Sequence, residues 1–136
     1  MFRLDKRKIF LLYHYYLVDS FFNHKSGEYK DEKEQKRVLW LKDCLKNKNF
    51  LQEKIAKKLK TGWEFSRLPP LEKAVLTYAT YELFSAQDFN QVKMLIDQTI
   101  NFSKVYLEEG KYKYINKILD LLFKEKNTDK DEFKKI

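Results

Sequence analysis

Apolar residues recur at helical spacing through most of the chain, and few residues interrupt them. Only 3 glycines and 2 prolines occur among 136 residues, which favours long helices over a sheet built on tight turns. The pattern is clearest near the C-terminus, where apolar side chains line one helix face and lysines line the opposite face. The apolar set is Ile115, Ile118, Leu119, Leu122 and Phe123, and the lysines are Lys113, Lys117 and Lys124. We therefore expect an all-α fold.

The same periodicity predicts one domain over residues 1–125, a bundle of about six or seven helices around an apolar N-terminal helix. Residues 2–22 form this first helix, since a helix that is apolar nearly all round is typical of a core position. A charged tail without apolar period follows at residues 126–136 and is expected to fray. The expected connections are a loop over 23–30, a break over 46–49, Gly62 as a helix C-cap, Pro69-Pro70, and Gly110 before the last helix.

The helix expected before Gly62 carries four lysines, which we interpret as a solvated face and not as a binding patch. They are Lys54, Lys57, Lys58 and Lys60. Cys44 stands near Leu41 and Leu45 at helical spacing and is expected to be a small core residue. A lone cysteine cannot form an internal disulfide or a thiolate metal site, and the two histidines lie in other contexts, so we expect no metal and no cofactor.

Basic residues precede the apolar run of the first helix, a layout that is similar to a secretory signal peptide. The run from Ile9 to Val18 contains His14 and bulky tyrosines, and no small-residue cleavage site follows it. It is also too short to span a bilayer, so we expect no targeting or membrane role. The basic residues instead emerge from the core at the amino end of a helix, where unpaired N–H groups favour phosphate.

The charge balance of the chain points to an anionic partner without proving one. There are 28 lysines and arginines against 20 aspartates and glutamates, a net charge of +8. Nucleic acid is the commonest partner for such a charge. A lysine-rich surface also keeps a small protein soluble without any partner, and an AT-rich genome would enrich lysine by codon usage. Charge alone leaves both interpretations open.

Five short segments, in their order and spacing, resemble the C-terminal two thirds of NusB proteins. They are GWEFSRL at 62–68, EKAVL at 72–76, YEL at 81–83, the segment 92–104, and KYIN at 113–116 followed by LD at 119–120. Each segment is common by itself, but five in register are much stronger evidence. The resemblance implies an all-α, NusB-like helical bundle.

The resemblance also implies a function, which is RNA binding in transcription antitermination. NusB proteins bind a single-stranded boxA-like signal in ribosomal RNA leader transcripts, together with the small ribosomal-subunit protein NusE. They act in the cytoplasm within an antitermination complex of RNA polymerase, without enzymatic activity. Whether this chain acts alone, as a dimer or with NusE is left open.

Two groups of residues are the candidate RNA-binding residues. The first group consists of Arg3, Lys6, Arg7 and Lys8. The resemblance implies an arginine-rich start in this region, which Asp5 interrupts in this chain. The second, at the start of the last helix, consists of Lys113, Tyr114, Asn116 and Lys117. Tyr114 matches an aromatic position of the family, and its ring either stacks on an unpaired base or covers Leu121 at the core edge.

The chain departs from the NusB pattern at positions that bear on function. Asp97 and Gln98 stand where the family usually has an amide followed by an acid, so an acidic contact with a partner cannot be assumed. Lys117 stands where the family often has glycine, which permits close backbone approach. Lysines in the first group also lack the forked grip of arginine on phosphate.

These departures support a second hypothesis, a helical adaptor that binds protein partners without sequence-specific RNA recognition. An enzyme is a third hypothesis, but the chain has no glycine-rich cofactor loop and no paired nucleophile and base. We therefore expect no catalysis.

Overall fold

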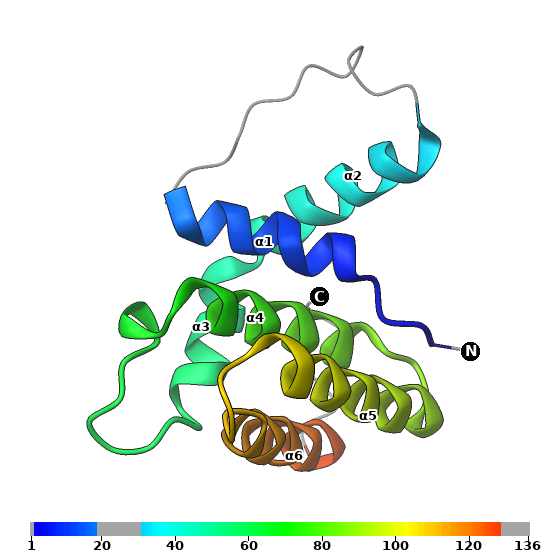
Figure 1. Cartoon of the computed structure of the whole chain (residues 1–136). Coiled ribbons are helices and arrows are strands. Elements are labelled where there is room, and N and C mark those ends of the chain that lie inside the picture. Colours follow the sequence, from blue (N-terminus) through cyan, green and yellow to red (C-terminus); the bar gives the residue numbers. More distant parts are fainter. Residues whose placement is uncertain (1, 19–30, 129–136) are drawn as a thin grey trace.

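A computed structural model describes residues 2–18 and 31–128 of the chain, and these residues are helical with short connections (Figure 1). The expected loop over 23–30 and the last residues of the expected tail, 129–136, lie outside this description. The described residues form six α-helices and one 3-10 helix, which confirms the all-α prediction. The elements are α1 (Lys6–Val18), α2 (Glu32–Lys46), α3 (Lys48–Ala56), η2 (Phe65–Arg67), α4 (Pro70–Ser85), α5 (Phe89–Tyr106) and α6 (Tyr112–Thr128).

Helix α4 is the most deeply buried element of the bundle. Ten of its 16 residues are buried, against two in α1, namely Ile9 and Leu12. α1 packs along α4 but leaves its last residues in solvent, since Leu17 is 56% and Val18 is 48% exposed. The expectation that the first helix is covered on all sides is therefore wrong in detail. Pro70 at the first turn of α4 suits its fixed backbone angle and the absence of an N–H.

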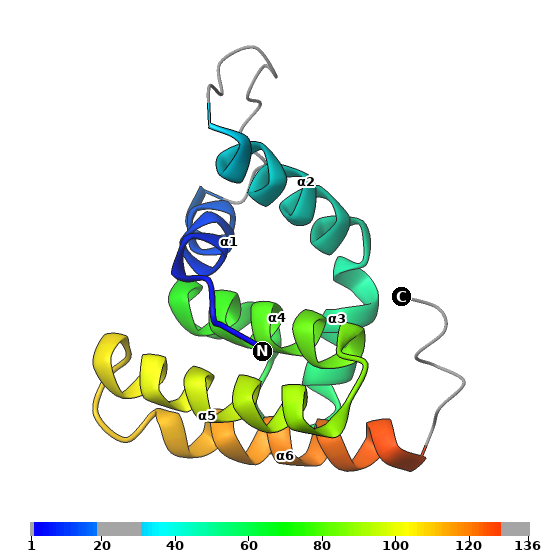
Figure 2. The same cartoon turned by 90° about the vertical axis from the view of Figure 1, so that its right-hand side faces the viewer.

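Helices α5 and α6 form an antiparallel pair on the side of α4 opposite to α1 and α2 (Figure 2). The apolar face predicted for the last helix is confirmed, because Ile115, Ile118, Leu119 and Leu122 are all buried in the core. Gly110 adopts a left-handed φ of 84° in the turn between the two helices, a conformation that glycine tolerates best. None of the helices in the described residues is long and apolar enough to cross a membrane.

Two helix boundaries differ from the prediction: α1 begins at Lys6 and not at residue 2, and α3 ends several residues before Gly62. The start of α2 is capped by Asp31, whose carboxylate accepts a hydrogen bond from the backbone N–H of Lys33. α3, however, ends at Ala56, so Gly62 is not its C-cap but a residue of the following turn, with a φ of 90°. A glycine signals a left-handed position, and the distance from that position to the helix end depends on the packing of the connection.

The interpretation of Lys54 as part of a solvated face is wrong. Lys54 is only 8% exposed, and its ammonium lies 3.0 Å from the carboxylate of Glu125 on α6. Lys58 approaches the other oxygen of the same carboxylate at 3.1 Å. The two lysines join α3 to α6, an arrangement that single-helix periodicity does not contain. Cys44, in contrast, is fully buried in the core as predicted.

The end of α6 closes the bundle against α4. The Lys126 ammonium donates to the carbonyl oxygens of Leu83 and Ala86 at 2.7 and 2.5 Å, where α4 has run out of intrahelical donors. Burial lowers the pKa of Lys126 to about 8, so the side chain remains a cation at neutral pH. The first three residues of the expected tail thus belong to α6.

The ion pair between α3 and α6 predicts how stability depends on pH. Burial by itself would raise the pKa of Glu125, but the hydrogen bonds and charges of Lys54 and Lys58 outweigh burial and hold it below 4.5. The folded state then binds this proton less tightly than the unfolded state, so the stabilisation is present above pH 4.5 and is lost as the pH falls through the folded-state pKa. In urea titrations, Glu125→Gln should lose more free energy of unfolding near neutral pH than at acidic pH.

Glu53→Gln is the matched control, because Glu53 pairs with Lys57 on the exposed surface of α3. Its effect should stay within about 0.5 kcal/mol over the same pH range. A loss for Glu125→Gln that does not change with pH would contradict the assignment.

Candidate nucleic-acid interface

The first predicted group, called here the α1 patch (Arg3, Lys6, Arg7 and Lys8), lies where the chain enters α1. Residues 2–5 precede the helix and are not helical, so Arg3 stands on the connecting segment and not on α1. Arg3, Lys6 and Arg7 are exposed, whereas Lys8 is half-buried. The patch is therefore continuous in sequence but divided in its exposure.

Acidic residues of neighbouring helices engage two of these four cations. Arg7 pairs with Glu34 of α2 at 2.9 Å, although it remains accessible to solvent. Lys8 lies 3.7 Å from Glu82 of α4 and 4.9 Å from the centre of the Trp40 ring. Burial raises the pKa of Glu82, while Lys8 and the indole N–H of Trp40 act against that rise. Lys8 is thus largely used inside the protein.

Arg3 and Lys6 are the cations of the α1 patch that remain most available. In the described part of the chain, Arg3 has no acidic partner within ion-pair distance. The Lys6 ammonium lies 5.5 Å from the centre of the Tyr106 ring of α5, a weak cation–π contact that leaves its charge exposed. Both side chains can reach a phosphate without breaking an internal salt bridge.

Asp5, which interrupts the basic run in the sequence, organises the start of α1. One oxygen of its carboxylate accepts the backbone N–H of Arg7 at 3.0 Å, as an N-cap does. The other oxygen accepts from the Arg37 guanidinium of α2 at 2.9 Å. The amino end of α1, which we expected to favour phosphate, is thus already occupied by the chain's own carboxylate.

Two further lysines extend the α1 patch, and the sequence analysis missed them. Lys33 and Lys36 of α2 line a hollow of about 330 Å³ together with Asp5, Lys8 and Arg37. Their spacing of three residues places them on one face of α2. That face meets the start of α1 only because the two helices pack together, which periodicity within α2 does not reveal.

The second predicted group, called the α6 patch (Lys113, Tyr114, Asn116 and Lys117), is exposed except for its tyrosine. Tyr114 is half-buried, and its hydroxyl donates a hydrogen bond to the Glu72 carboxylate at the start of α4. Burial raises the pKa of this hydroxyl well above its usual range. Its ring meets the Trp63 ring edge to face, with 5.5 Å between centroids.

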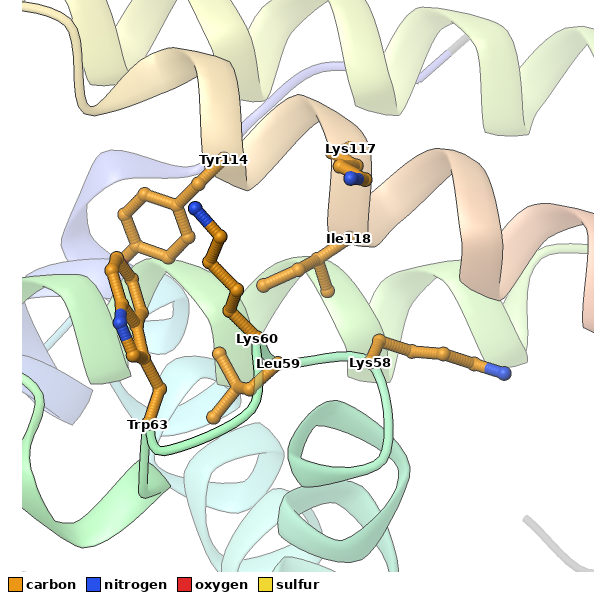
Figure 3. A pocket seen from close by; sticks show the side chains of 7 residues that line it. All are labelled: Lys58, Leu59, Lys60, Trp63, Tyr114, Lys117 and Ile118. Carbon is orange, nitrogen blue, oxygen red and sulfur yellow. The ribbon is translucent and has the colours of Figure 1, made fainter.

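A cavity of about 210 Å³ opens beside Tyr114 and Trp63 (Figure 3). Leu59 and Ile118 form apolar walls beside the two aromatic rings, and the remaining lining residues are lysines. The full lining is Lys58, Leu59, Lys60, Trp63, Tyr114, Lys117 and Ile118. Trp63 is 44% exposed, so part of its ring remains open to a ligand. The cavity, which we call the Trp63 pocket, combines an aromatic face with positive charge.

The structure does not bring the two patches together. Lys8 of the α1 patch contacts Glu82, whereas Tyr114 of the α6 patch contacts Glu72. These two positions of α4 lie about 15 Å apart along the helix axis. In Figure 1 the N-terminus lies on the right and the green connection between α3 and α4 on the left. A ligand that bound both patches would have to extend across the molecule.

Gln98 of α5 is another residue whose role only the structure reveals. Its side-chain amide binds the backbone of Phe2 and Leu4, on either side of Arg3. Asp97, the other departure from the expected pattern, is exposed. The amide at position 98 therefore forms hydrogen bonds within the protein, whereas the acid at position 97 is exposed to solvent.

The described residues contain no group of three or more His, Cys, Asp or Glu side chains placed to hold a metal ion. The fold is that of a small all-α protein with basic surface patches and an aromatic pocket. In comparison with known families, the model of the NusB family matches residues 9–124. The chain belongs to the NusB family.

Individual proteins that are similar to this chain are named as NusB proteins. The chain is 31% identical to the transcription antitermination protein NusB of Methylacidiphilum infernorum over 96 residues, which are 70% of this chain and 66% of that protein. It is 34% identical to the protein of that name from Carboxydothermus hydrogenoformans over 79 residues, 58% of this chain and 54% of the relative. The aligned part thus spans 54% to 66% of the length of these two relatives. No solved structure matches the chain.

The N-cap at Asp5 predicts a measurable loss of stability. Asp5→Ala should lower the free energy of unfolding by about 0.5–2 kcal/mol, because the helix loses its cap and Arg37 loses its carboxylate partner. Urea unfolding followed by circular dichroism measures this value. Asp120→Ala, which changes an exposed acid of α6, is the matched control and should be neutral or slightly stabilising. Equal stability of both variants would contradict the capping role.

Proposed function

We propose that this protein is an RNA-binding transcription antitermination factor of NusB type. It acts in the cytoplasm and binds a single-stranded, boxA-like signal in ribosomal RNA leader transcripts together with NusE, within an antitermination complex of RNA polymerase. The role is non-catalytic. The family membership supports the class of function, and the observation that carries RNA binding is the exposed pair of cations, Arg3 and Lys6, on the same stretch of chain as Asp5 and Lys8, which line a hollow with the lysines of α2.

The α1 patch binds the phosphate backbone in this proposal. Arg3 presents a planar guanidinium that can hold a phosphate with two parallel hydrogen bonds, and Lys6 adds a point charge. Lys33 and Lys36 continue the positive surface onto α2. Phosphate contacts supply affinity and orientation but carry no sequence information, so base selectivity must come from another part of the surface.

The Trp63 pocket is our candidate for a contact with an unpaired base. The hydroxyl of Tyr114 is held by Glu72 and its ring already packs on Trp63, so the open aromatic surface belongs mainly to Trp63. A base that stacks there would have Lys60 and Lys117 nearby for its phosphate. Because the pocket lies far from the α1 patch, one RNA strand would use both only in an extended conformation.

An adaptor that binds only protein is the second candidate, and one observation favours it. Val105 and Tyr106 of α5 are 75% and 41% exposed, beside Leu4 and Phe102, which line the same hollow. Exposed apolar residues in a cluster often mark a protein contact. The RNA measurements below separate the two candidates.

The α1 patch predicts a salt-dependent, signal-dependent affinity. A titration compares a short RNA that carries a boxA-like signal with a scrambled RNA, with and without NusE, at several salt concentrations. Arg3→Gln and Lys6→Gln should each reduce the slope of log affinity against log salt by about 0.7, because each removes one phosphate contact. Lys46→Gln, at an exposed lysine at the far end of α2, should leave the slope unchanged. Equal and weak binding of both RNAs with NusE present would refute the RNA function and favour the adaptor.

The Trp63 pocket predicts a loss of RNA affinity that does not depend on the phosphate contacts. Trp63→Leu should weaken binding of the signal RNA about 5- to 150-fold, the equivalent of roughly 1–3 kcal/mol for one stacked base. The salt slope should stay the same, because no phosphate contact is lost. Wild-type tryptophan fluorescence should also change on RNA binding, and this change should be absent in the variant. Unchanged affinity in Trp63→Leu would exclude the pocket from the RNA path.

A further inference from the structure

The backbone of the segment that carries Arg3 is hydrogen-bonded to α5 through the side chain of Gln98. The backbone N–H of Leu4 donates to the amide oxygen of Gln98 at 2.7 Å. The amide nitrogen of Gln98 donates to the backbone carbonyl oxygen of Phe2 at 3.0 Å. Gln98 thus satisfies a backbone acceptor and a backbone donor two residues apart, as the peptide group of a neighbouring strand would do.

This pairing determines where the Arg3 side chain points. In extended backbone, successive side chains lie on opposite sides. Phe2 and Leu4 are half-buried and pack against the core, whereas Arg3 between them is exposed. Because Gln98 binds the backbone on both sides of Arg3, the guanidinium is held toward solvent while its two neighbours are held inward.

The segment is anchored independently at its other end. The backbone N–H of Asp5 donates to the Tyr78 hydroxyl of α4 at 3.1 Å, and the Asp5 carboxylate binds Arg37. Loss of the Gln98 contacts would therefore loosen residues 2–4, which would keep only the apolar packing of Phe2 and Leu4, but would leave the start of α1 in place. A change at position 98 should act locally and not on the fold as a whole.

Only an amide satisfies both backbone groups. A carboxylate at position 98 could accept from the N–H of Leu4 but could not donate to the carbonyl of Phe2, and it would bring a negative charge next to that oxygen. Gln98 is half-buried, so water compensates only in part for a lost bond. The chemistry of the position thus requires glutamine, not merely a side chain of that length.

We propose that Gln98 is a positioning residue, which holds the N-terminal segment so that Arg3 is presented to the phosphate backbone of RNA. This inference rests on the proposed RNA-binding function. When the segment is already ordered, binding does not have to restrict it. Release of residues 2–4 should therefore weaken RNA binding through Arg3 by about 5- to 50-fold, since ordering the backbone of one residue costs on the order of a tenfold factor.

Three variants of the whole chain test the proposal. Gln98→Glu removes one hydrogen bond and adds a charge, and Gln98→Met removes both bonds without charge. Asn101→Asp adds the same charge at an exposed position of α5 that lines the same hollow beside Leu4, and it is the matched control. The first measurement, amide hydrogen exchange of Leu4 by NMR, needs no RNA. Gln98→Met, which removes the acceptor, should expose this amide, whereas Gln98→Glu, whose carboxylate can still accept it, and Asn101→Asp should not.

The second measurement is a double-mutant cycle with Arg3→Ala, read as affinity for the short signal RNA. If Gln98 acts through Arg3, Gln98→Met should weaken binding in the wild-type background but change it less than twofold in the Arg3→Ala background. Equal losses in both backgrounds would overturn the positioning role, as would unchanged Leu4 exchange in Gln98→Met. Absence of RNA binding by the wild-type protein would refute the proposed function itself. Faster exchange of the Leu4 amide in Gln98→Met would, even then, demonstrate that Gln98 holds the N-terminal segment.

Discussion

Helix α4 is surrounded by the other helices, and its buried polar groups decide how they are arranged. A polar atom that leaves water must find a partner, and these partners come from α1, the segment before α1, α2 and α6. The pairs are Glu72 with Tyr114, Thr77 with Tyr16, Tyr78 with the backbone of Asp5, and Glu82 with Trp40. Apolar burial drives the helices together, but it is not directional. The hydrogen bonds select one arrangement among those that would bury similar areas.

The same arrangement decides which surface charges remain available. Lys8 contacts Glu82 and Trp40 because α1 lies along α4. A cation that the sequence predicted for the binding patch is therefore engaged by residues of the protein itself. Lys54 meets Glu125 because α3 packs against α6. Arg3, by contrast, is held outward by contacts of its backbone neighbours. The proposed RNA-binding surface thus consists of the cations that remain after internal pairing, so it has fewer available charges than the net charge of +8 implies.

Local rules predicted the secondary structure well where the signal itself is local. The apolar face of α6 and the buried Cys44 follow from helical spacing, and both are present. The rules failed at two residues. Gly62 was assigned to a helix end that lies several residues earlier, and Lys54 was assigned to solvent. For Lys54 the deciding contact is made by Glu125 of α6, which no pattern within one helix contains. For Gly62, local turn hydrogen bonds separate the end of α3 from the glycine.

By itself, the sequence determined that the chain folds into helices, which faces of those helices are apolar, and that five segments in register resemble the NusB family. Periodicity and local backbone preferences carry this information because they depend on neighbours a few positions away. Only the tertiary structure decided that Asp5 caps α1 and binds Arg37, that Gln98 holds the segment around Arg3, and that Trp63 shapes a pocket. Each of these depends on a side chain from another segment, because the contacts form only when packing brings distant segments within hydrogen-bond or van der Waals range.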